Sequence, residues 1–487
     1  MELDKSIKQK VLIFSVLYII LNTILILNEF FWLNLLPLAL LIIYIFLFHF
    51  KAFLFIIIAF LPISLPLNSI INGSSFYLTI PSGILIIISV VIFITKVLFE
   101  NSINRKILSH PVTLAIFINL IWILITSVTS SLPAVSFTFL AYRIEFVIIF
   151  YFMFLLIFIS YKKFYTFIWL YSLSFIIVLI YFINRLYTYG ISNIMHTANW
   201  VSKPFFPDHT SYATVMTMLL SVLGFSFITL KKSSSYYRLL NLIIFITLFF
   251  GLIISYTRAA WFSLFVASCF IIPYLLKIKL KYTLSVVFIF VLSLSIFWSK
   301  IQLSLIYNRQ QSSSNIFKHL QSATNVSSDL SNLERINRWN SALRMFQEKP
   351  ILGFGPGTYS FKYAPYQATK DKTFISTNFG NLGNAHSEYF GPLSESGVFG
   401  LISFLGIVFT SLFTASRVYF TAKKRKIKYL ALGLIIGLLS YYIHGLINNF
   451  LDLDKLNCLF WGFTAMVVAL DIYHKKIEEK KRSIFYY

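Results

Sequence analysis

The chain has 487 residues, of which 58% are hydrophobic and 12% are charged, and its formal net charge is +24. Soluble globular domains carry about 25% charged residues, so this composition excludes a soluble protein and predicts a polytopic membrane protein. The basic residues stand in short clusters between apolar stretches, which is typical of multi-span proteins under the positive-inside rule. This placement favours membrane lipids with anionic headgroups as partners and argues against nucleic acid.

Apolar stretches long enough to cross a bilayer recur along the chain. A hydrocarbon core of about 30 Å takes about 20 helical residues to cross, and about fourteen stretches approach that length. They cover residues 11–28, 31–49, 52–69, 81–99, 111–129, 141–160, 164–183, 211–230, 239–256, 259–276, 282–299, 397–418, 428–447 and 456–473. No small-residue cleavage site follows the first stretch, so we expect a retained span rather than a removed signal peptide. The sequence therefore predicts an all-α, polytopic integral membrane helix bundle of about 12–14 transmembrane helices.

The charge of the connections predicts the orientation of the spans. If the amino terminus is cytoplasmic, every second connection is basic, and an even number of spans leaves both termini on the cytoplasmic side. Three longer polar segments then share the opposite face, at residues 184–210, 300–396 and 444–455. We expect four parts: a first part of the transmembrane bundle (1–299), a large outer loop (300–396), C-terminal transmembrane helices (397–473) and a basic cytoplasmic tail (474–487).

The second half of the large loop predicts an amphipathic helix. Ser331 and Glu334 have the spacing of a capping box, and Pro350 ends the pattern. The apolar residues at helical spacing are Leu333, Ile336, Trp339, Leu343 and Phe346. We expect a helix of about 17 residues that lies against the bundle or the membrane interface, with Arg335 at the edge of its apolar stripe.

Two other parts of the loop show neither helical periodicity nor a nucleotide-binding motif. Residues 310–328 are polar and without periodicity, so we expect irregular structure. The run Gly353-Phe354-Gly355-Pro356-Gly357 is not followed by Lys-Ser/Thr and has no strand before it. We interpret it as a helix exit and a turn, not as a phosphate-binding loop.

Arg258 and Arg143 are two arginines of the outer face that stand at the ends of apolar stretches. Arg258 lies where two apolar stretches meet with almost no loop between them, and Arg143 precedes Glu145 at the outer start of another stretch. An arginine in such a place is costly unless it is paired, so each either has a functional partner or reaches the interface with its head group while its stem packs on apolar surface.

His386 is the candidate for proton transfer. It is flanked by Asn384, Ser387 and Glu388 just before a span. A histidine can accept the proton of an attacking hydroxyl at neutral pH, as transfer to a sugar would require, but a loop histidine is also often structural. The same two interpretations apply to His196, His209 and His444, whose spacing defines no metal cluster, and Cys269 and Cys458 lie in apolar stretches, which favours packing over a disulfide or a metal site.

Two runs of the large loop resemble the signature of the O-antigen ligase and O-antigen polymerase superfamily. The first pairs Arg335 with Trp339 and continues with Pro-x-x-Gly-x-Gly from Pro350, and the second has the pattern His-x-x-Tyr-x-x-x-x-x-Glu-x-Gly-x-x-Gly from His386 to Gly400. Together they cover about 70 residues, and the multi-span layout with a late outer loop extends the resemblance to most of the chain.

The resemblance implies a glycosyltransferase of the bacterial inner (plasma) membrane with its active site facing the periplasm. Such enzymes move a glycan from an undecaprenyl diphosphate carrier to an acceptor hydroxyl, either on lipid A core in a lipopolysaccharide ligase or on another lipid-linked repeat in a polymerase. The family transfers glycans without a metal or another cofactor and with inversion at the anomeric carbon. The sequence does not separate a ligase from a polymerase, although we favour a ligase-like protein.

The resemblance also assigns roles to residues of this chain. The essential histidine of the family falls on His386, the arginine at the membrane mouth on Arg258, and the arginine of the loop on Arg335. Arginine recognises diphosphate with two parallel hydrogen bonds and stabilises the charge of the leaving carrier. We expect Arg143 and Arg338 as further diphosphate-binding candidates, and Glu388 and Tyr389 as supporting residues.

Two alternatives remain at this point. Glu388 either fixes the tautomer of His386 or is a solvated loop residue. The whole chain is alternatively a transporter or flippase of lipid-linked oligosaccharides, which predicts charges buried at mid-span and repeat symmetry between the halves. The charges gather instead at span ends on one face, which favours the transferase.

Overall fold

The computed structural model describes residues 5–70, 78–100, 104–160, 162–189, 201–230, 234–278, 330–373, 376 and 383–474, with single positions at 282, 285 and 293. The predicted all-α membrane bundle is confirmed: this part of the chain has 11 helices long and apolar enough to cross a membrane. Its strands, Leu65–Pro66 (β1) and Thr79–Ile80 (β2), form one antiparallel pair of two residues each. The predicted span at 282–299, the irregular segment at 310–328 and His196 lie outside the described residues.

The chain divides into two compact units, residues 1–58 and 59–487. The first contains α1 (Lys5–Leu27), the 3-10 helix η1 (Trp32–Leu35), α2 (Leu36–Phe48) and most of α3 (Phe50–Phe60). The predicted second and third spans differ from the prediction, since α2 has 13 residues and α3 has 11. At 1.5 Å per residue neither crosses a core of about 30 Å. Proline limits both helices: Pro37 stands at the start of α2, and Pro62 and Pro66 follow α3.

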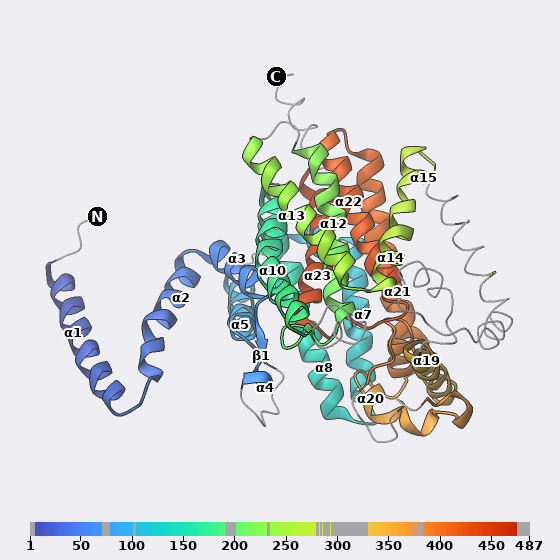
Figure 1. Ribbon diagram of the computed structural model, residues 1–487, viewed down its shortest axis with the longest axis horizontal. Coiled ribbons are helices and arrows are strands. Elements are labelled where there is room, and N and C mark those ends of the chain that lie inside the picture. The colour runs from blue at the N-terminus through green and yellow to red at the C-terminus, as the bar shows by residue number, and fades with distance from the viewer. Residues whose placement is uncertain are drawn as a thin grey trace. The chain divides into compact units, whose positions relative to one another are not determined.

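The second unit is the main helical bundle (Figure 1). Short helices α4 (Leu67–Ile70) and α6 (Arg105–Leu108) accompany its long helices, which are α5 (Ser82–Glu100), α7 (Pro111–Val128), α8 (Pro133–Phe146) continued by the π-helix η2 (Val147–Met153) and α9 (Phe154–Phe158), α10 (Lys162–Tyr189), α12 (His209–Thr229), α13 (Ser235–Ile254), α14 (Arg258–Cys269) continued by α15 (Ile271–Leu275), α21 (Phe390–Thr421), α22 (Arg425–His444), and α23 (Asp454–Ala469) continued by η6 (Leu470–His474). The most deeply buried of them are α12, α22 and α23. Cys269 and Cys458 are both free.

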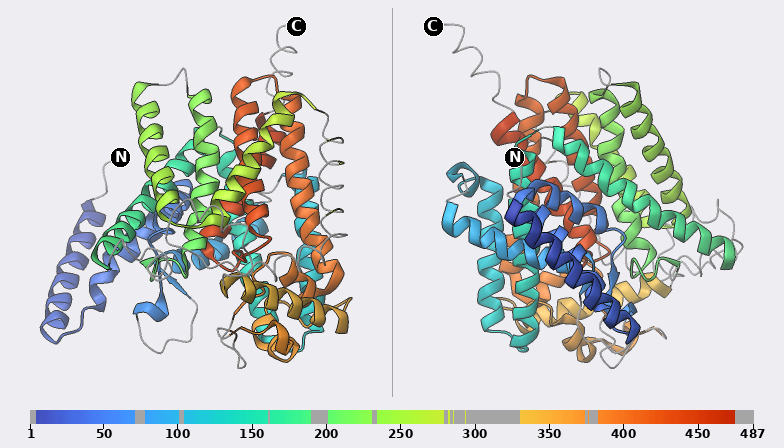
Figure 2. Two further views of the ribbon diagram at one scale, coloured as in Figure 1. Left: turned by 45° about the vertical axis from the view of Figure 1, so that its right-hand side comes forward. Right: turned by 90° about the vertical axis from the view of Figure 1, so that its left-hand side faces the viewer.

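The described part of the large loop folds into a small layer of its own. It contains α19 (Leu330–Glu348), α20 (Tyr359–Lys362) and the 3-10 helices η4 (Ala364–Tyr366) and η5 (Thr369–Asp371). Its hydrophobic core consists of Ala342, Met345, Phe354, Tyr359, Tyr363 and Ala385. Figure 2 shows this layer at one end of the bundle and the connection between α21 and α22 at the other end.

Helix α19 confirms the predicted amphipathic helix but buries a different face. Its buried residues are Glu334, Asn337, Arg338, Ser341, Ala342 and Met345, whereas the five residues of the predicted apolar stripe are only half-buried. The Glu334 carboxylate accepts hydrogen bonds from Arg338 Nε (2.8 Å) and from the Ser376 hydroxyl, so it binds inside the loop layer. A buried polar face of this kind needs partners from elsewhere in the chain, which helical periodicity does not reveal.

The glycine-rich run after α19 is a turn, as predicted, and it packs on α21. Gly353, Gly355 and Gly357 have φ of 65°, 112° and 75°, and Gly355 N–H donates to the Glu395 carbonyl (2.8 Å). Helix α21 begins at Phe390, and residue 397, where we expected the loop to end, is a kink with φ 68° and ψ −168°. The kink leaves room for Val398 N–H to donate to the Pro350 carbonyl (2.9 Å).

We expect Gly397→Ala to destabilise the protein by about 3 kcal/mol or more, because it combines a left-handed backbone with a steric clash. A Cβ at this position would lie 2.0 Å from the Ile351 carbonyl oxygen. The matched control is Gly406→Ala in the same helix, where no atom lies within 4 Å of the added Cβ and where alanine favours the helix. Thermal unfolding of the purified variants measures the difference, and equal melting temperatures would contradict the role of the kink.

Candidate functional site

His386 lies in a strained turn that leads into α21. Its φ is 49°, a left-handed conformation that is uncommon for residues other than glycine and that clusters at functional sites. The turn is held on both sides: His386 N–H donates to Asn384 Oδ1 (3.1 Å) and the His386 carbonyl accepts from Trp339 Nε1 (3.2 Å). The imidazole is half-buried, and its nitrogens have no hydrogen-bond partner among the described residues. The backbone is therefore fixed while the ring is available to a ligand.

Arg338 stabilises this turn from α19. Only 6% of Arg338 is exposed; its Nε lies 2.8 Å from Glu334 Oε1, and one terminal nitrogen donates to the Asn384 carbonyl (3.3 Å). Its guanidinium also stacks 4.3 Å above the Tyr363 ring centroid. The structure therefore places this diphosphate-binding candidate inside the loop layer, where it positions the His386 turn.

Arg335 and Asp208 share the surroundings of His386. Burial, followed by the positive charges of Arg335 and Arg338, lowers the pKa of His386 to about 4, while Asp208 and Glu334 oppose this shift. Arg335 and Asp208 also lie within electrostatic range of His209 and His444. The structure thus brings together a group that we call the histidine cluster: Arg335, His386, Asp208, His209 and His444.

Asp208 is a member of this cluster that the sequence analysis missed. Its Oδ1 caps α12 by accepting hydrogen bonds from Thr210 N–H and Ser211 N–H, both at 2.8 Å. An aspartate directly before a span, followed by His-Thr-Ser, is the signal that could have located this helix start. The start of α14 adjoins it, since the Thr257 hydroxyl donates to the His209 carbonyl (3.2 Å). Arg258, the first residue of α14, therefore begins its helix beside the histidine cluster.

His444 lies at the end of α22 with one ring nitrogen bonded and the other open. Its Nδ1 lies 2.8 Å from the Thr214 hydroxyl, which also lies 2.8 Å from the Thr210 carbonyl. Its Nε2 is buried and has no hydrogen-bond partner among the described residues. His444 thus offers one ring nitrogen to the histidine cluster.

Glu388 and Tyr389, the predicted supporting residues, face α22 and the turn between α22 and α23. The Glu388 carboxylate accepts hydrogen bonds from Tyr441 OH (2.8 Å) and from the N–H groups of Phe450 (2.6 Å) and Leu451 (2.8 Å). Tyr389 OH donates to the Tyr442 carbonyl (3.0 Å). Glu388 is 4% exposed, so it is no solvated loop residue, and these bonds direct its carboxylate to the α22–α23 turn.

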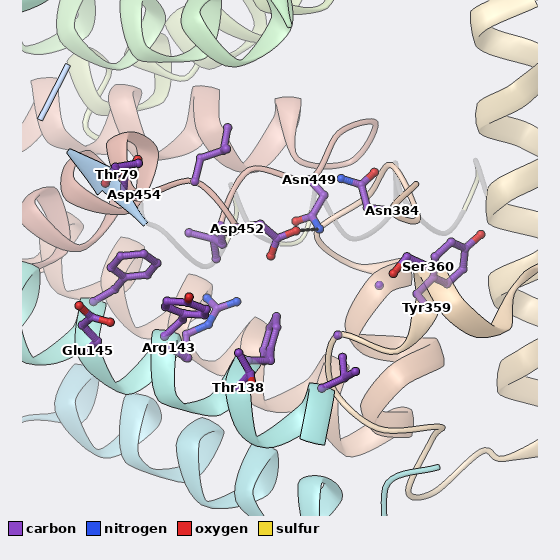
Figure 3. A pocket seen from close by; sticks show the side chains of 18 of the residues that line it. Thr79, Thr138, Arg143, Glu145, Tyr359, Ser360, Asn384, Asn449, Asp452 and Asp454 are labelled. Carbon is purple, nitrogen blue, oxygen red and sulfur yellow. Dashed lines mark hydrogen bonds between the residues drawn. The ribbon is translucent and has the colours of Figure 1, made fainter. Parts of the chain in front are cut away.

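A cavity of about 860 Å³ lies beside the His386 turn. Figure 3 shows Arg143 and Glu145 of α8 on one side of it and Asn384, Asn449 and Asp452 on the other. Arg143 does not stand at the start of its span as predicted, because Pro133 begins α8 a few turns earlier. Burial and then Asp452 raise the pKa of Glu388 to about 7, while Arg143 opposes the shift. Arg143 therefore belongs electrostatically to this cavity, and the structure does not bring it to the histidine cluster.

Fold and site together define a polytopic helical membrane protein with a histidine and arginine site at the mouth of its bundle. Residues 243–405 match the family model described as O-Antigen ligase. This match supports the resemblance seen in the motifs: residues 243–405 carry an O-antigen ligase domain, which points to a ligase-like or polymerase-like role in polysaccharide biosynthesis. The match includes Arg258, Arg335 and His386 and ends within α21. No curated protein matches the chain.

Proposed function

We propose that this protein is a glycosyltransferase that moves a glycan from undecaprenyl diphosphate to an acceptor hydroxyl at the periplasmic face. The observation that carries the proposal is the His386 turn: a strained backbone held by Asn384 and Trp339, a ring without partners among the described residues, and Arg335 close by. A base beside a guanidinium suits the attack of a hydroxyl on a carbon that bears a diphosphate leaving group.

The proposed reaction follows from these groups. A nitrogen of His386 takes the proton of the acceptor hydroxyl, whose oxygen forms a bond to the anomeric carbon from the face opposite the diphosphate. The bond between that carbon and the phosphate oxygen breaks, and its electron pair leaves with undecaprenyl diphosphate. Arg335 and Arg258 stabilise the charge that develops on the leaving group, as two-point donors to phosphate oxygens. Attack from the opposite face inverts the anomeric carbon.

The charge of the connections supports the proposed orientation. The connection between α21 and α22 and the first turn of α22 carry Lys423, Lys424, Arg425, Lys426 and Lys428, and they lie at the end of the bundle opposite the loop layer (Figure 2). Under the positive-inside rule this basic end is cytoplasmic. The His386 turn then faces the periplasm of a bacterial inner membrane, and both termini are cytoplasmic.

Two experiments test the proposal. Purified protein in lipid nanodiscs, supplied with undecaprenyl-diphosphate-linked oligosaccharide and an acceptor glycan, is expected to release undecaprenyl diphosphate and extend the acceptor. Deletion in the native host then separates the two possible acceptors. Loss of all polymer from lipid A indicates a ligase, whereas a single capped repeat indicates a polymerase. Absence of transfer with either acceptor, and unchanged host glycans, would reject the proposal.

The pH dependence of transfer reports on His386. Only the unprotonated ring accepts a proton, so with a pKa of about 4 its contribution is present at neutral pH and is lost as the pH falls through about 4. Arg335→Gln removes one charge that lowers this pKa, and its acid limb is expected to move towards the ordinary histidine value of about 6.5. Profiles of kcat/KM between about pH 3.5 and 8 measure the shift. An acid limb at the same pH in both proteins would show that Arg335 does not lower the pKa of His386.

A further inference from the structure

We propose that the cavity beside the His386 turn binds the neutral, polyhydroxylated end of the acceptor glycan. That the ligand is the acceptor substrate rests on the proposed function, whereas the presence of a glycan-binding site follows from the cavity alone. The cavity wall includes Asn384, Ala385 and Glu388, which stand immediately around His386 in the chain. A sugar held there would present its hydroxyl to the turn that carries the base.

The charges of the cavity disfavour an anionic ligand. Five carboxylic acids line it against the single guanidinium of Arg143: Glu145, Glu388, Glu395, Asp452 and Asp454. Arg143 lies within electrostatic range of Glu388 and Asp452, so nearby carboxylates already balance its charge. A diphosphate would meet repulsion from those carboxylates that are ionised at neutral pH, which for Glu388, with a pKa of about 7, is about half of the molecules. The carrier diphosphate is therefore expected at Arg335, on the other side of the His386 turn.

Three of the carboxylates maintain the walls of the cavity. Glu395 Oε1 accepts a hydrogen bond from Tyr359 N–H (2.9 Å), and Glu388 accepts from Phe450 N–H (2.6 Å). Asp454 is tied to β2, since its Oδ2 accepts from the Thr79 hydroxyl (2.9 Å). These contacts hold the loop after the glycine-rich turn, the α22–α23 turn and β2 in place around the space.

Other polar groups of the cavity remain open to a ligand. The Glu145 carboxylate has no hydrogen-bond partner among the described residues, and the Arg143 guanidinium stacks 5.2 Å above the Phe139 ring centroid. Asn384 also lines the space (Figure 3), and Tyr142 adds an aromatic ring to its wall. Mixed acceptors and donors beside aromatic rings suit a sugar, whose hydroxyls need both and whose C–H faces pack on rings. A volume of about 860 Å³ lies within the range of about 300–1,000 Å³ found for small-ligand sites.

Thiol labelling tests the charge of the cavity without turnover. Thr138→Cys places a thiol on its wall, in a Cys269→Ser background that leaves only the buried Cys458. The rates of a cationic and an anionic methanethiosulfonate reagent are compared, and their ratio is divided by the ratio at Gln347→Cys, an exposed position of α19 outside the cavity. We expect the cationic reagent to label Thr138→Cys about tenfold faster than the anionic one after this normalisation. Adding Glu145→Gln is expected to reduce this ratio, because it removes a negative charge. An equal or inverted ratio would overturn the inference.

Protection from labelling tests the ligand. Oligosaccharides released by mild acid from the lipid-linked glycans and from the lipopolysaccharide of the native host are pooled and separated into neutral and anionic fractions. Each fraction is added before the reagent, with inorganic diphosphate as a third probe. The neutral fraction is expected to slow labelling of Thr138→Cys at least about fivefold and to leave Gln347→Cys unchanged. Protection by the anionic fraction or by diphosphate instead, or by none of the three, would overturn the inference.

A kinetic measurement separates this inference from the proposed function. In the transfer assay, Glu145→Gln is expected to raise the KM of the acceptor glycan about tenfold and to leave the KM of the donor unchanged. The reason is that sugar hydroxyls donate stronger hydrogen bonds to a charged carboxylate than to a neutral amide. If protection occurs but no transfer is detected with any protein, the cavity binds a glycan and the proposed function fails. If transfer occurs and Glu145→Gln leaves the acceptor KM unchanged, the proposed function holds and the acceptor inference fails.

Discussion

Replacing His386 by alanine is expected to lower the rate of glycan transfer about 10²–10⁴-fold, the usual contribution of a general base. The ring makes no hydrogen bond within the described structure, whereas the backbone of the turn is held by Asn384 and Trp339. Removing the imidazole therefore leaves the turn in place, and the loss is expected in kcat with little change in the KM of either substrate. Turnover of undecaprenyl-diphosphate-linked oligosaccharide in nanodiscs measures it.

Two further variants show whether this loss is chemical. His386→Asn is also expected to be inactive, because asparagine tolerates the left-handed backbone at this position and has no basic nitrogen. His49→Gln, at an exposed position of the first unit, is the matched histidine control and is expected to retain full activity. Normal transfer by purified His386→Ala would remove His386 from the reaction, while loss of activity in all three variants would indicate a general effect of substitution.

Arg335→Lys is expected to lower kcat about 10–100-fold, and Arg335→Gln about 10²–10³-fold. Lysine keeps the positive charge but cannot reproduce the two parallel hydrogen bonds of a guanidinium to phosphate oxygens. The donor KM is expected to rise more in the glutamine variant than in the lysine variant, because binding of the diphosphate depends mainly on charge. The same order is expected at Arg258, where the Thr257–His209 bond places the start of α14 beside the histidine cluster.

The control for Arg335 removes a positive charge elsewhere. Arg425 is exposed at the start of α22, at the end of the bundle opposite the loop layer (Figure 2). Arg425→Gln is expected to leave both kcat and the donor KM unchanged. Equal activity of Arg335→Lys and the unsubstituted protein would show that only charge matters at this position, and equal activity of Arg335→Gln would exclude Arg335 from the site.

Local sequence signals predicted the helices well where a single segment decides its own structure. The span at α7 begins at Pro111 after the His110 cap and ends at Val128, within one residue of the predicted stretch. This agreement arises because the length, the hydropathy and the capping signal are all properties of the segment itself. The stretches at 31–49 and 52–69 failed because prolines within and after them shorten the helices. The start of α8 was also missed, since Pro133 lies in a segment less apolar than the stretch that follows it.

The candidate site could be predicted only in part. Motif spacing singled out His386 and Arg335. The i,i+4 spacing of Glu334 and Arg338 could have predicted their ion pair, but nothing local indicated that Glu388 binds the α22–α23 turn. Asp208 was missed because it comes from a segment far away in the chain and reaches the site through the packing of α12. Helical periodicity pointed to the wrong inner face of α19, because it scores apolar residues and the buried face is polar.

By itself the sequence determined that this chain is a helical membrane bundle with a basic face and a late outer loop that carries the His386 motif. These properties follow from the length, hydropathy and charge of single segments, which a bilayer selects directly. Only the tertiary structure decided which charges meet: Arg335, Asp208 and three histidines in one group, and Arg143 with the carboxylates of the cavity in another. Contacts between helix ends that are distant in the chain depend on packing, and no local pattern encodes them.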